Sequence, residues 1–296
     1  MREYLLRFFE EFDYPEEARE VLILAYDKII EGENTEARFS KLLASYDESY
    51  DIGYGNAIDE MKEISKDAVI HEYTGALLLF ICFSKKLEEY YKKSDIDREI
   101  FVTSMYDLKY KLMECKEVYG IYGSFVAGWF PGFFRLNRFG FGKLQFEIIK
   151  FGDEYTNRVI RLFPESPVIN VHIPRTGGRL DEESRKRSYA MAAEFFAEIL
   201  DENPIVFVCN SWLLFPRHTE ILKPGSNVLG FMSDYDIYKS GLYDDYGQVW
   251  RLFDTYYTGD VDKLPQNGSF RRAYADLIRR GEKTGWGRGV YVYPRY

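Results

Sequence analysis

The chain has 296 residues, 46% hydrophobic and 18% aromatic, so its composition excludes a disordered protein and suits two medium domains or one large one. Its formal net charge of −9 argues against a general nucleic-acid binder, which would be basic. The widely spaced Cys82, Cys115 and Cys209 form no CxxC pair, which predicts reduced thiols in a cytoplasmic protein and no metal site.

Hydrophobic periodicity predicts that residues 1–118 form a helical N-terminal domain. The longest apolar run without a charge, residues 73–84, is much shorter than a bilayer-spanning helix, so we expect a buried helix and no membrane association. In chain order, the helices we expect cover residues 15–31, a segment from about residue 35, residues 67–93 and residues 97–116.

The charge is divided unevenly along the chain. Residues 1–118 carry 16 Lys+Arg against 27 Asp+Glu, a net charge of −11. The remaining 23 Lys+Arg and 21 Asp+Glu give +2. We therefore expect an anionic ligand to bind the C-terminal part.

From residue 119 onward, strand-forming segments alternate with helices, which predicts a mixed α/β sheet in a C-terminal domain of residues 119–296. Its first residues, 119–134, are rich in glycine and aromatic side chains, which either line a substrate groove or pack at a domain junction. The strands we expect are residues 133–136, 143–151, 158–162, 168–173, 205–210, 227–238, 248–257 and 289–293. The helices are residues 181–200, 216–222 and 269–280.

A strand, a loop and a helix at residues 168–181 carry the most chemical information. A β-branched strand ends at His172, a loop with glycines and arginines follows, and a helix begins near Asp181. Backbone N–H groups, cationic side chains and a positive helix end can together bind an anion. An ordinary β-to-α loop would have a similar composition. The residues we expect to contact an anionic cofactor are Ile173, Arg175, Gly177, Gly178 and Arg179.

Two residues are candidates for proton transfer. His172 is one of only three histidines and ends a predicted strand, where ligands bind in open α/β sheets. It is either a catalytic base or a packing residue, and strand alternation places Asn170 on the same face. Glu147 shares a strand face with Gln145. It is either a base with a raised pKa or a solvent-facing residue at a sheet edge.

Further candidates follow the strand at residues 205–210. Asn210 and Trp212 are candidates for substrate binding, and Ser211 could act as a general acid or cap a helix. Cys209 lies in an apolar strand, so we expect it in the core. Asn227, in a turn entering the next predicted strand, either caps the turn or faces the cleft.

Six ordered segments between residues 140 and 286 resemble a bacterial family of acyltransferase domain-containing proteins. In this family a helical N-acyltransferase N-terminal domain precedes a domain like the GCN5-related N-acetyltransferases (GNATs). The segments are Gly140–Glu147, Val171–Pro174, Val208–Leu214, Leu222–Asn227, Leu264-Pro265 and Thr284–Trp286.

The resemblance implies an α+β protein, with an all-helical domain packed on a mixed α/β GNAT-like domain. It also implies transfer of an acyl group from acyl-CoA, or another acyl-thioester, to a small-molecule amine or hydroxyl. In that architecture two parallel strands part in mid-sheet, the pantetheine arm pairs with the exposed strand, and the pyrophosphate sits at the start of the next helix. Residues 168–173 and the helix from Asp181 match this arrangement.

The chain departs from the family at one position, because many members read Cys-His-Ser-Trp where this chain reads Cys209-Asn210-Ser211-Trp212. Asparagine can orient a substrate but cannot take up a proton at neutral pH. A binding protein without catalysis on the same scaffold, or a carbohydrate-binding or carbohydrate-processing protein, are the alternative functions. The oligomeric state is not predicted.

Overall fold

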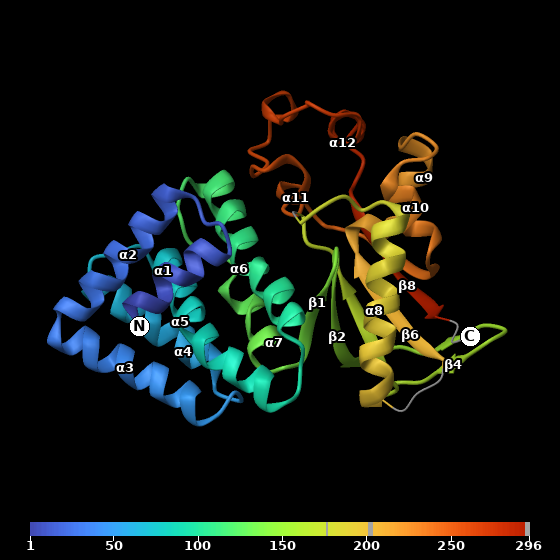
Figure 1. Ribbon diagram of the computed structural model, residues 1–296. Coiled ribbons are helices and arrows are strands. Elements are labelled where there is room, and N and C mark those ends of the chain that lie inside the picture. Colours follow the sequence, from blue (N-terminus) through green and yellow to red (C-terminus); the bar gives the residue numbers. More distant parts are fainter. Residues whose placement is uncertain (176, 201–203, 294–296) are drawn as a thin grey trace. The chain divides into compact units, whose positions relative to one another are not determined.

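The computed structural model describes residues 1–175, 177–200 and 204–293 (Figure 1). The chain divides into two compact units, Met1–Phe139 and Gly140–Tyr296. The first unit is helical and the second contains a mixed sheet, so the expected α+β class is confirmed. The division falls later in the chain than the boundary expected after residue 118.

The helical unit contains amphipathic helices whose apolar faces meet around α5. α5 is buried over residues 74–84 and is therefore central to this unit. The bounds are α1 Arg2–Glu11, α2 Glu16–Glu31, α3 Glu33–Glu48, α4 Tyr54–Asp67, α5 Glu72–Lys93, α6 Arg98–Tyr119 and α7 Pro131–Phe134, with a 3-10 turn η1 at Ala127–Trp129.

The aromatic stretch after α6 belongs to the core of the helical unit. The Phe80 ring of α5 lies 5.0 Å from the ring centroids of both Phe130 and Phe134. The backbone of Ser124 donates a hydrogen bond to the Tyr73 carbonyl. These contacts explain why this unit extends beyond α6, and they favour the core-packing interpretation of residues 119–134.

The second unit is built on a six-stranded sheet in the order β1-β2-β5-β6-β8-β7, with a separate hairpin of β3 and β4. The β5–β6 pair is parallel, whereas the β2–β5, β6–β8 and β7–β8 pairs are antiparallel. The strands are β1 Arg138–Phe141, β2 Leu144–Lys150, β3 Tyr155–Thr156, β4 Arg161–Leu162, β5 Pro167–His172, β6 Ile205–Ser211, β7 Asp236–Leu242 and β8 Gly285–Tyr293. The helices are α8 Glu182–Leu200, α9 His218–Ile221, α10 Asn227–Ser233, α11 Trp250–Phe253 and α12 Ser269–Arg279, with 3-10 turns η2 Trp212–Leu214 and η3 Val261–Lys263.

Strand alternation gives the sheet two different faces. One face carries Phe146 and Phe207, which pack against Tyr189 of α8 with ring-centroid distances of 6.1 and 5.3 Å. On the opposite face, Val168 and Val208 belong to a core cluster with the β3–β4 hairpin. Asn170 and His172 share the face of Val168, so both side chains point away from α8.

Four predicted elements were wrong in whole or in part, and local backbone chemistry explains each. Residues 133–136 are not a strand, because Pro131 starts the helical turn α7. Residues 227–233 are helical, because the Ser226 side chain accepts the Leu229 N–H and caps α10. The predicted strand at 248–257 contains α11, which ends at Asp254 in a left-handed conformation.

The fourth error is the start of the helix expected over residues 67–93, which is confirmed only from Glu72 onward. Val69 adopts a positive φ of 53°, which ends α4 one turn before α5 begins. The His71 ring then accepts the Tyr73 N–H and caps α5, so His71 is exposed at a helix start and does not lie within a buried helix.

Candidate active site

The two central parallel strands pair over only two positions. Ile169 pairs with Phe207 and Asn170 with Val208, and the ladder ends there. Both strands continue, β5 to His172 and β6 to Ser211, and all of these residues lie within the described ranges. The backbones of the two strands are therefore unpaired with each other beyond Asn170, as expected where parallel strands part in mid-sheet.

A histidine–carboxylate pair lies where the strands part. The His172 Nε2 is 2.8 Å from the Glu147 Oε2 and 3.2 Å from the Asn170 Nδ2. The antiparallel β2–β5 register places Glu147 opposite Asn170 and Gln145 opposite His172, which brings these side chains together on one face. The His172 and Glu147 side chains are 17% and 16% exposed, so both are half-buried and reachable from solvent.

The short contact with Glu147 indicates the tautomer of His172. A carboxylate can only accept a hydrogen bond, so the Nε2 carries the hydrogen and donates it to Glu147, and the Asn170 Nδ2 at 3.2 Å therefore cannot donate to the same nitrogen. The lone pair of the neutral ring then resides on Nδ1. Glu147 thus orients the imidazole and stabilises its protonated form, which is the role of the carboxylate in a base–orienter pair.

The other predicted site residues are divided between two places. Asn210 is exposed and lies on the face of Val208, and therefore on the side of His172. The Ser211 Oγ accepts the Leu213 N–H at 3.1 Å and caps η2. Trp212 stacks on Phe270 with ring centroids 5.7 Å apart, within another apolar cluster of the second unit.

Asn227 and Cys209 have different surroundings. Asn227 is the exposed first residue of α10, and no contact in the described structure joins it to the His172 pair. Cys209 is 2% exposed, which confirms that it is a core residue, and burial raises the pKa of its thiol.

The predicted anion-binding loop follows β5, and its glycines adopt conformations that other residues rarely take. Gly177 and Gly178 have φ values of 85° and 103°. Arg175 forms an ion pair with Asp254, which follows α11, whereas Arg179 is exposed. Ile173 is half-buried, and Thr176 lies outside the described residues.

The start of α8 is already capped by a carboxylate of the chain. The Asp181 Oδ1 accepts the Ser184 N–H at 2.9 Å, and this hydrogen bond lowers the pKa of Asp181. Glu182 and Glu183 follow in the first turn. Because these carboxylates offset the positive helix end, the loop glycines and nearby cations are better placed than the helix start to bind phosphate.

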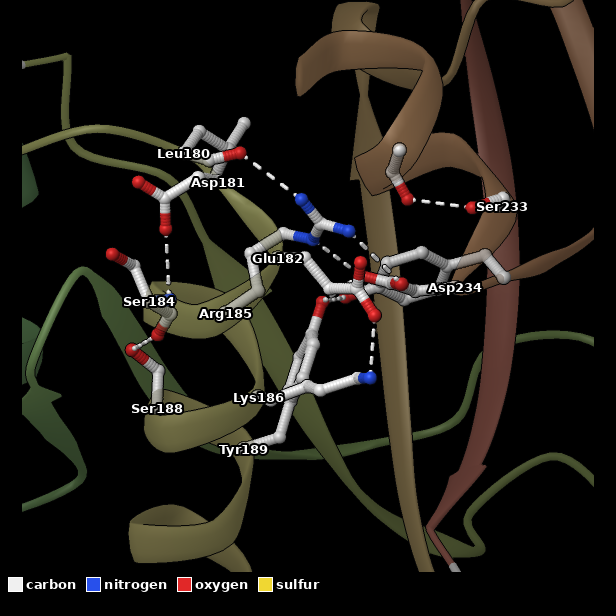
Figure 2. Close-up of polar contacts among 12 residues, drawn as sticks. Leu180, Asp181, Glu182, Ser184, Arg185, Lys186, Ser188, Tyr189, Ser233 and Asp234 are labelled. Atoms are coloured by element: carbon white, nitrogen blue, oxygen red, sulfur yellow. Dashed lines mark hydrogen bonds and ion pairs between the residues drawn. The ribbon is translucent and has the colours of Figure 1, made fainter. Parts of the chain in front are cut away.

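Two buried cations next to this loop were missed by the sequence analysis. Lys143, in the turn between β1 and β2, is 6% exposed, and burial lowers its pKa to about 8. Arg185, in the first turn of α8, is 3% exposed and forms an ion pair with Asp234 (Figure 2). Lys143 falls within the Gly140–Glu147 segment on which the resemblance rests, which was the available signal.

The described residues offer neither a further metal site nor a membrane-spanning helix. No group of three or more His, Cys, Asp or Glu residues among them could hold a metal ion. Within the same ranges, every helix is too short or too polar to pass through a bilayer.

Each of the two units corresponds to a known domain. A model of the GNAT-like C-terminal domain matches residues 138–291, and a model of the N-acyltransferase N-terminal domain matches residues 3–136. The first match alone covers more than half of the chain. The protein therefore belongs to the family with a GNAT-like C-terminal domain, and its two domains identify it as an acyltransferase.

Solved structures of similar fold include two acyltransferase complexes. A mutant acyltransferase with octanoyl-CoA is 18% identical, with a TM-score of 0.77, and the match covers 99% of this chain and 88% of the other. An acyltransferase with decanoyl-CoA and teicoplanin is also 18% identical, with a TM-score of 0.75 and coverage of 97% and 87%. No curated protein sequence matches this chain.

Proposed function

We propose that the protein transfers an acyl group from acyl-CoA to an amine or hydroxyl of a small molecule. The observation that carries the proposal is the end of the β5–β6 ladder at Asn170, beside the hydrogen-bonded pair of His172 and Glu147. The exposed edge of β5 would pair with the pantetheine arm. The loop of residues 173–175 and 177–181, called the cofactor loop below, would hold the phosphates.

His172 would act as the general base. Its Nδ1 would take the proton from the acceptor nitrogen or oxygen as that atom attacks the thioester carbonyl. Glu147 would stabilise the resulting imidazolium through Nε2. The new carbonyl–acceptor bond forms, the carbon–sulfur bond breaks, and the coenzyme leaves as a thiol after gaining a proton.

The neighbouring residues would complete the site. Asn210, on the same face as His172, would orient the acceptor in place of the family histidine. The Ser211 hydroxyl caps η2 and lies, by strand alternation, on the face of Phe207, so the leaving sulfur would gain its proton from the imidazolium of His172. Trp212 and Asn227 would contact the acceptor only at the edge of the site.

The first test is binding of the donor. Acetyl-, octanoyl- and decanoyl-CoA belong in the panel, since structural neighbours were solved with the two longer thioesters. At 100-fold excess over Kd, a ligand that binds only the folded state stabilises it by about 2.7 kcal/mol. A shift in melting temperature with at least one thioester supports the proposal, and no shift at millimolar concentration contradicts it.

The second test is release of the coenzyme thiol in the presence of candidate acceptors. A thiol reagent would follow the reaction with small amines, amino sugars and glycopeptides, because one neighbour holds teicoplanin. We expect acceptor-dependent thiol release that His172→Gln abolishes. Bound donor without acceptor-dependent release from any of these classes would contradict the proposed acceptors and leave only acyl-CoA binding.

A further inference from the structure

Two buried cations hold the two ends of the cofactor loop by its carbonyl groups. The Lys143 Nζ donates to the Pro174 carbonyl at 2.6 Å. The Arg185 Nη1 donates to the Leu180 carbonyl at 3.0 Å, a contact visible in Figure 2. The glycines with positive φ lie between these two anchored carbonyls. The loop is therefore fixed where it begins and where it meets α8.

Each cation is itself held by a second segment of the unit. Asp234, after α10, accepts from the Arg185 Nε at 2.6 Å and from its Nη2 at 3.3 Å (Figure 2). The Lys143 backbone N–H donates to the Ser188 Oγ of α8 at 3.0 Å. The loop ends are thus tied to α8, to the β1–β2 turn and to the segment that follows α10.

Gly230 permits the close approach of α10 to this ion pair. A Cβ added at Gly230 would lie 3.3 Å from the Arg185 Nη2, closer than most Cβ contacts. The guanidinium therefore fills the space that a side chain would need. Two features therefore fix the Arg185 guanidinium: the Asp234 carboxylate binds it, and Gly230 leaves the space that it occupies.

Burying a cation costs desolvation free energy, which offsets much of the stability that its ion pair contributes. Replacing a buried ion pair by apolar residues of similar size is often neutral or stabilising, so such a pair contributes geometry more reliably than stability. The geometry here concerns the loop amides, because the C=O and N–H of a trans peptide point in opposite directions. With the Pro174 and Leu180 carbonyls turned toward the cations, the following N–H groups are directed away from them.

We propose that Lys143 and Arg185 are positioning residues that preset the cofactor loop for acyl-CoA, so that donor affinity depends on them and the chemical step does not. The inference rests on the proposed function, because it assumes that this loop binds the donor. A loop that is ordered before binding loses less conformational entropy on binding, which raises affinity without a new contact. Both cations act on the loop through the Pro174 and Leu180 carbonyls, so catalysis at saturating donor should persist.

The test compares each buried cation with an exposed cation of the same type. Lys143→Met is paired with Lys186→Met, whose side chain is 73% exposed on α8, and Arg185→Met with the exposed Arg187→Met. Calorimetry with octanoyl-CoA gives Kd, and steady-state kinetics give KM and kcat. We expect both buried-site variants to weaken donor binding by about tenfold or more, with kcat at saturation within about threefold of the parent. Both controls should bind like the parent.

A double variant separates positioning from stability. Arg185→Met alone leaves Asp234 buried without its cation and should lower the melting temperature. Arg185→Met with Asp234→Leu replaces the whole pair by apolar groups, so we expect stability to return while donor affinity stays low, because the Leu180 carbonyl has lost its donor. If the double variant regained both its stability and its donor affinity, the positioning role of Arg185 would be overturned.

The outcomes also distinguish this inference from the proposed function. If the parent binds no acyl-CoA, both fail. If the parent and the Lys143 and Arg185 variants bind acyl-CoA equally well, donor binding does not depend on the anchored loop ends. Only this inference is then overturned. Amide hydrogen exchange of the loop provides the second measurement: we expect faster exchange in both buried-site variants, and unchanged exchange would overturn the anchoring.

Discussion

The two units use their buried polar groups in different ways. In the helical unit, Ser65 and Ser104 bond carbonyls of their own helices, and Thr35, Tyr46 and Thr74 bond carbonyls of other segments of the same unit. In the second unit, Lys143 and Arg185 reach carbonyls of the cofactor loop, and His218 joins Leu213 to Tyr274. The bonds of the helical unit support helices that hydrophobic packing already specifies, whereas the bonds of Lys143 and Arg185 fix the two ends of the cofactor loop.

This difference predicts which property a mutation in each unit should change. Substitutions in the helical unit should change stability through packing and leave donor affinity unchanged. Substitutions at the buried ionisable groups of the second unit should change affinity, turnover or the pH dependence of stability. The following predictions test this difference, from the largest expected effect to the smallest.

The largest effect is expected at the histidine–carboxylate pair. His172→Gln removes the proposed base and should lower turnover by roughly 10²–10⁴-fold. Glu147→Gln should lower turnover by less, because it weakens the stabilisation of the imidazolium but keeps the ring. Melting temperatures should change little, since both side chains are partly exposed. His71→Gln in the helical unit is the matched control. Parent-like turnover of His172→Gln would make His172 a packing residue.

The second prediction concerns the core of the helical unit. Phe80 is fully buried and packs against Phe130 and Phe134, so Phe80→Ala should lower the free energy of unfolding by about 3–5 kcal/mol. Urea unfolding would measure the loss, and Phe80→Leu should lose less. At temperatures where the variant is folded, its Kd for octanoyl-CoA should equal that of the parent. A change in Kd would contradict the division of roles between the units.

The sequence predicted the elements whose signals are periodic. Alternating β-branched runs gave β2, β5 and β6 nearly to the residue, and the shared face of Asn170 and His172 followed from alternation. The proximity of Glu147 to His172 could not be predicted in the same way. It depends on the β2–β5 register, which is set by long-range pairing and not by either strand alone.

The sequence predictions failed where a single residue or a long-range contact decides the structure. A single side-chain cap at Ser226 turned an apolar segment with strand-like composition into α10. The break before α5 depends on Val69 in a left-handed conformation, which a β-branched residue rarely adopts. Lys143 and Arg185 look like ordinary surface cations in a sequence, and only the fold reveals their burial.

A third prediction uses the pH dependence of stability. His218 is fully buried, and burial lowers its pKa from 6.5 to about 4. The Nδ1 donates to the Leu213 carbonyl, so the ring is neutral and the Nε2 accepts from the Tyr274 hydroxyl. The unfolded chain binds a proton between pH 6.5 and 4 that the folded protein does not, so stability falls as the pH falls through this window.

The experiment compares unfolding free energies at pH 7.5 and pH 4. Protonation of His218 should account for a loss of about 3 kcal/mol in the parent, and His218→Gln should lack this part of the loss. Tyr274→Phe removes the hydrogen-bond partner but retains the titrating ring, so it should keep a steep pH dependence. Equal pH dependence in the parent and His218→Gln would show that His218 is not the group responsible.

The smallest effects are expected at two positions with positive φ, and they should have opposite signs. Val69 has a φ of 53° and is 77% exposed, so Val69→Gly removes left-handed strain of about 1–2 kcal/mol without losing much packing. The greater freedom of glycine in the unfolded chain offsets about 0.5–1 kcal/mol, which leaves a modest net stabilisation.

Gly178 presents the reverse case in the cofactor loop. Its φ is 103°, and nothing lies within 4 Å of an added Cβ, so Gly178→Ala should destabilise through backbone strain alone, by roughly 1 kcal/mol. It should also weaken octanoyl-CoA binding, because the strain shifts the loop between its two anchored ends. Val159→Gly, at an exposed valine outside the positive-φ positions, is the control and should be slightly destabilising. Donor affinity should therefore be unchanged in Val69→Gly and lower in Gly178→Ala. Either opposite result would contradict the division between a structural helical unit and a ligand-binding loop.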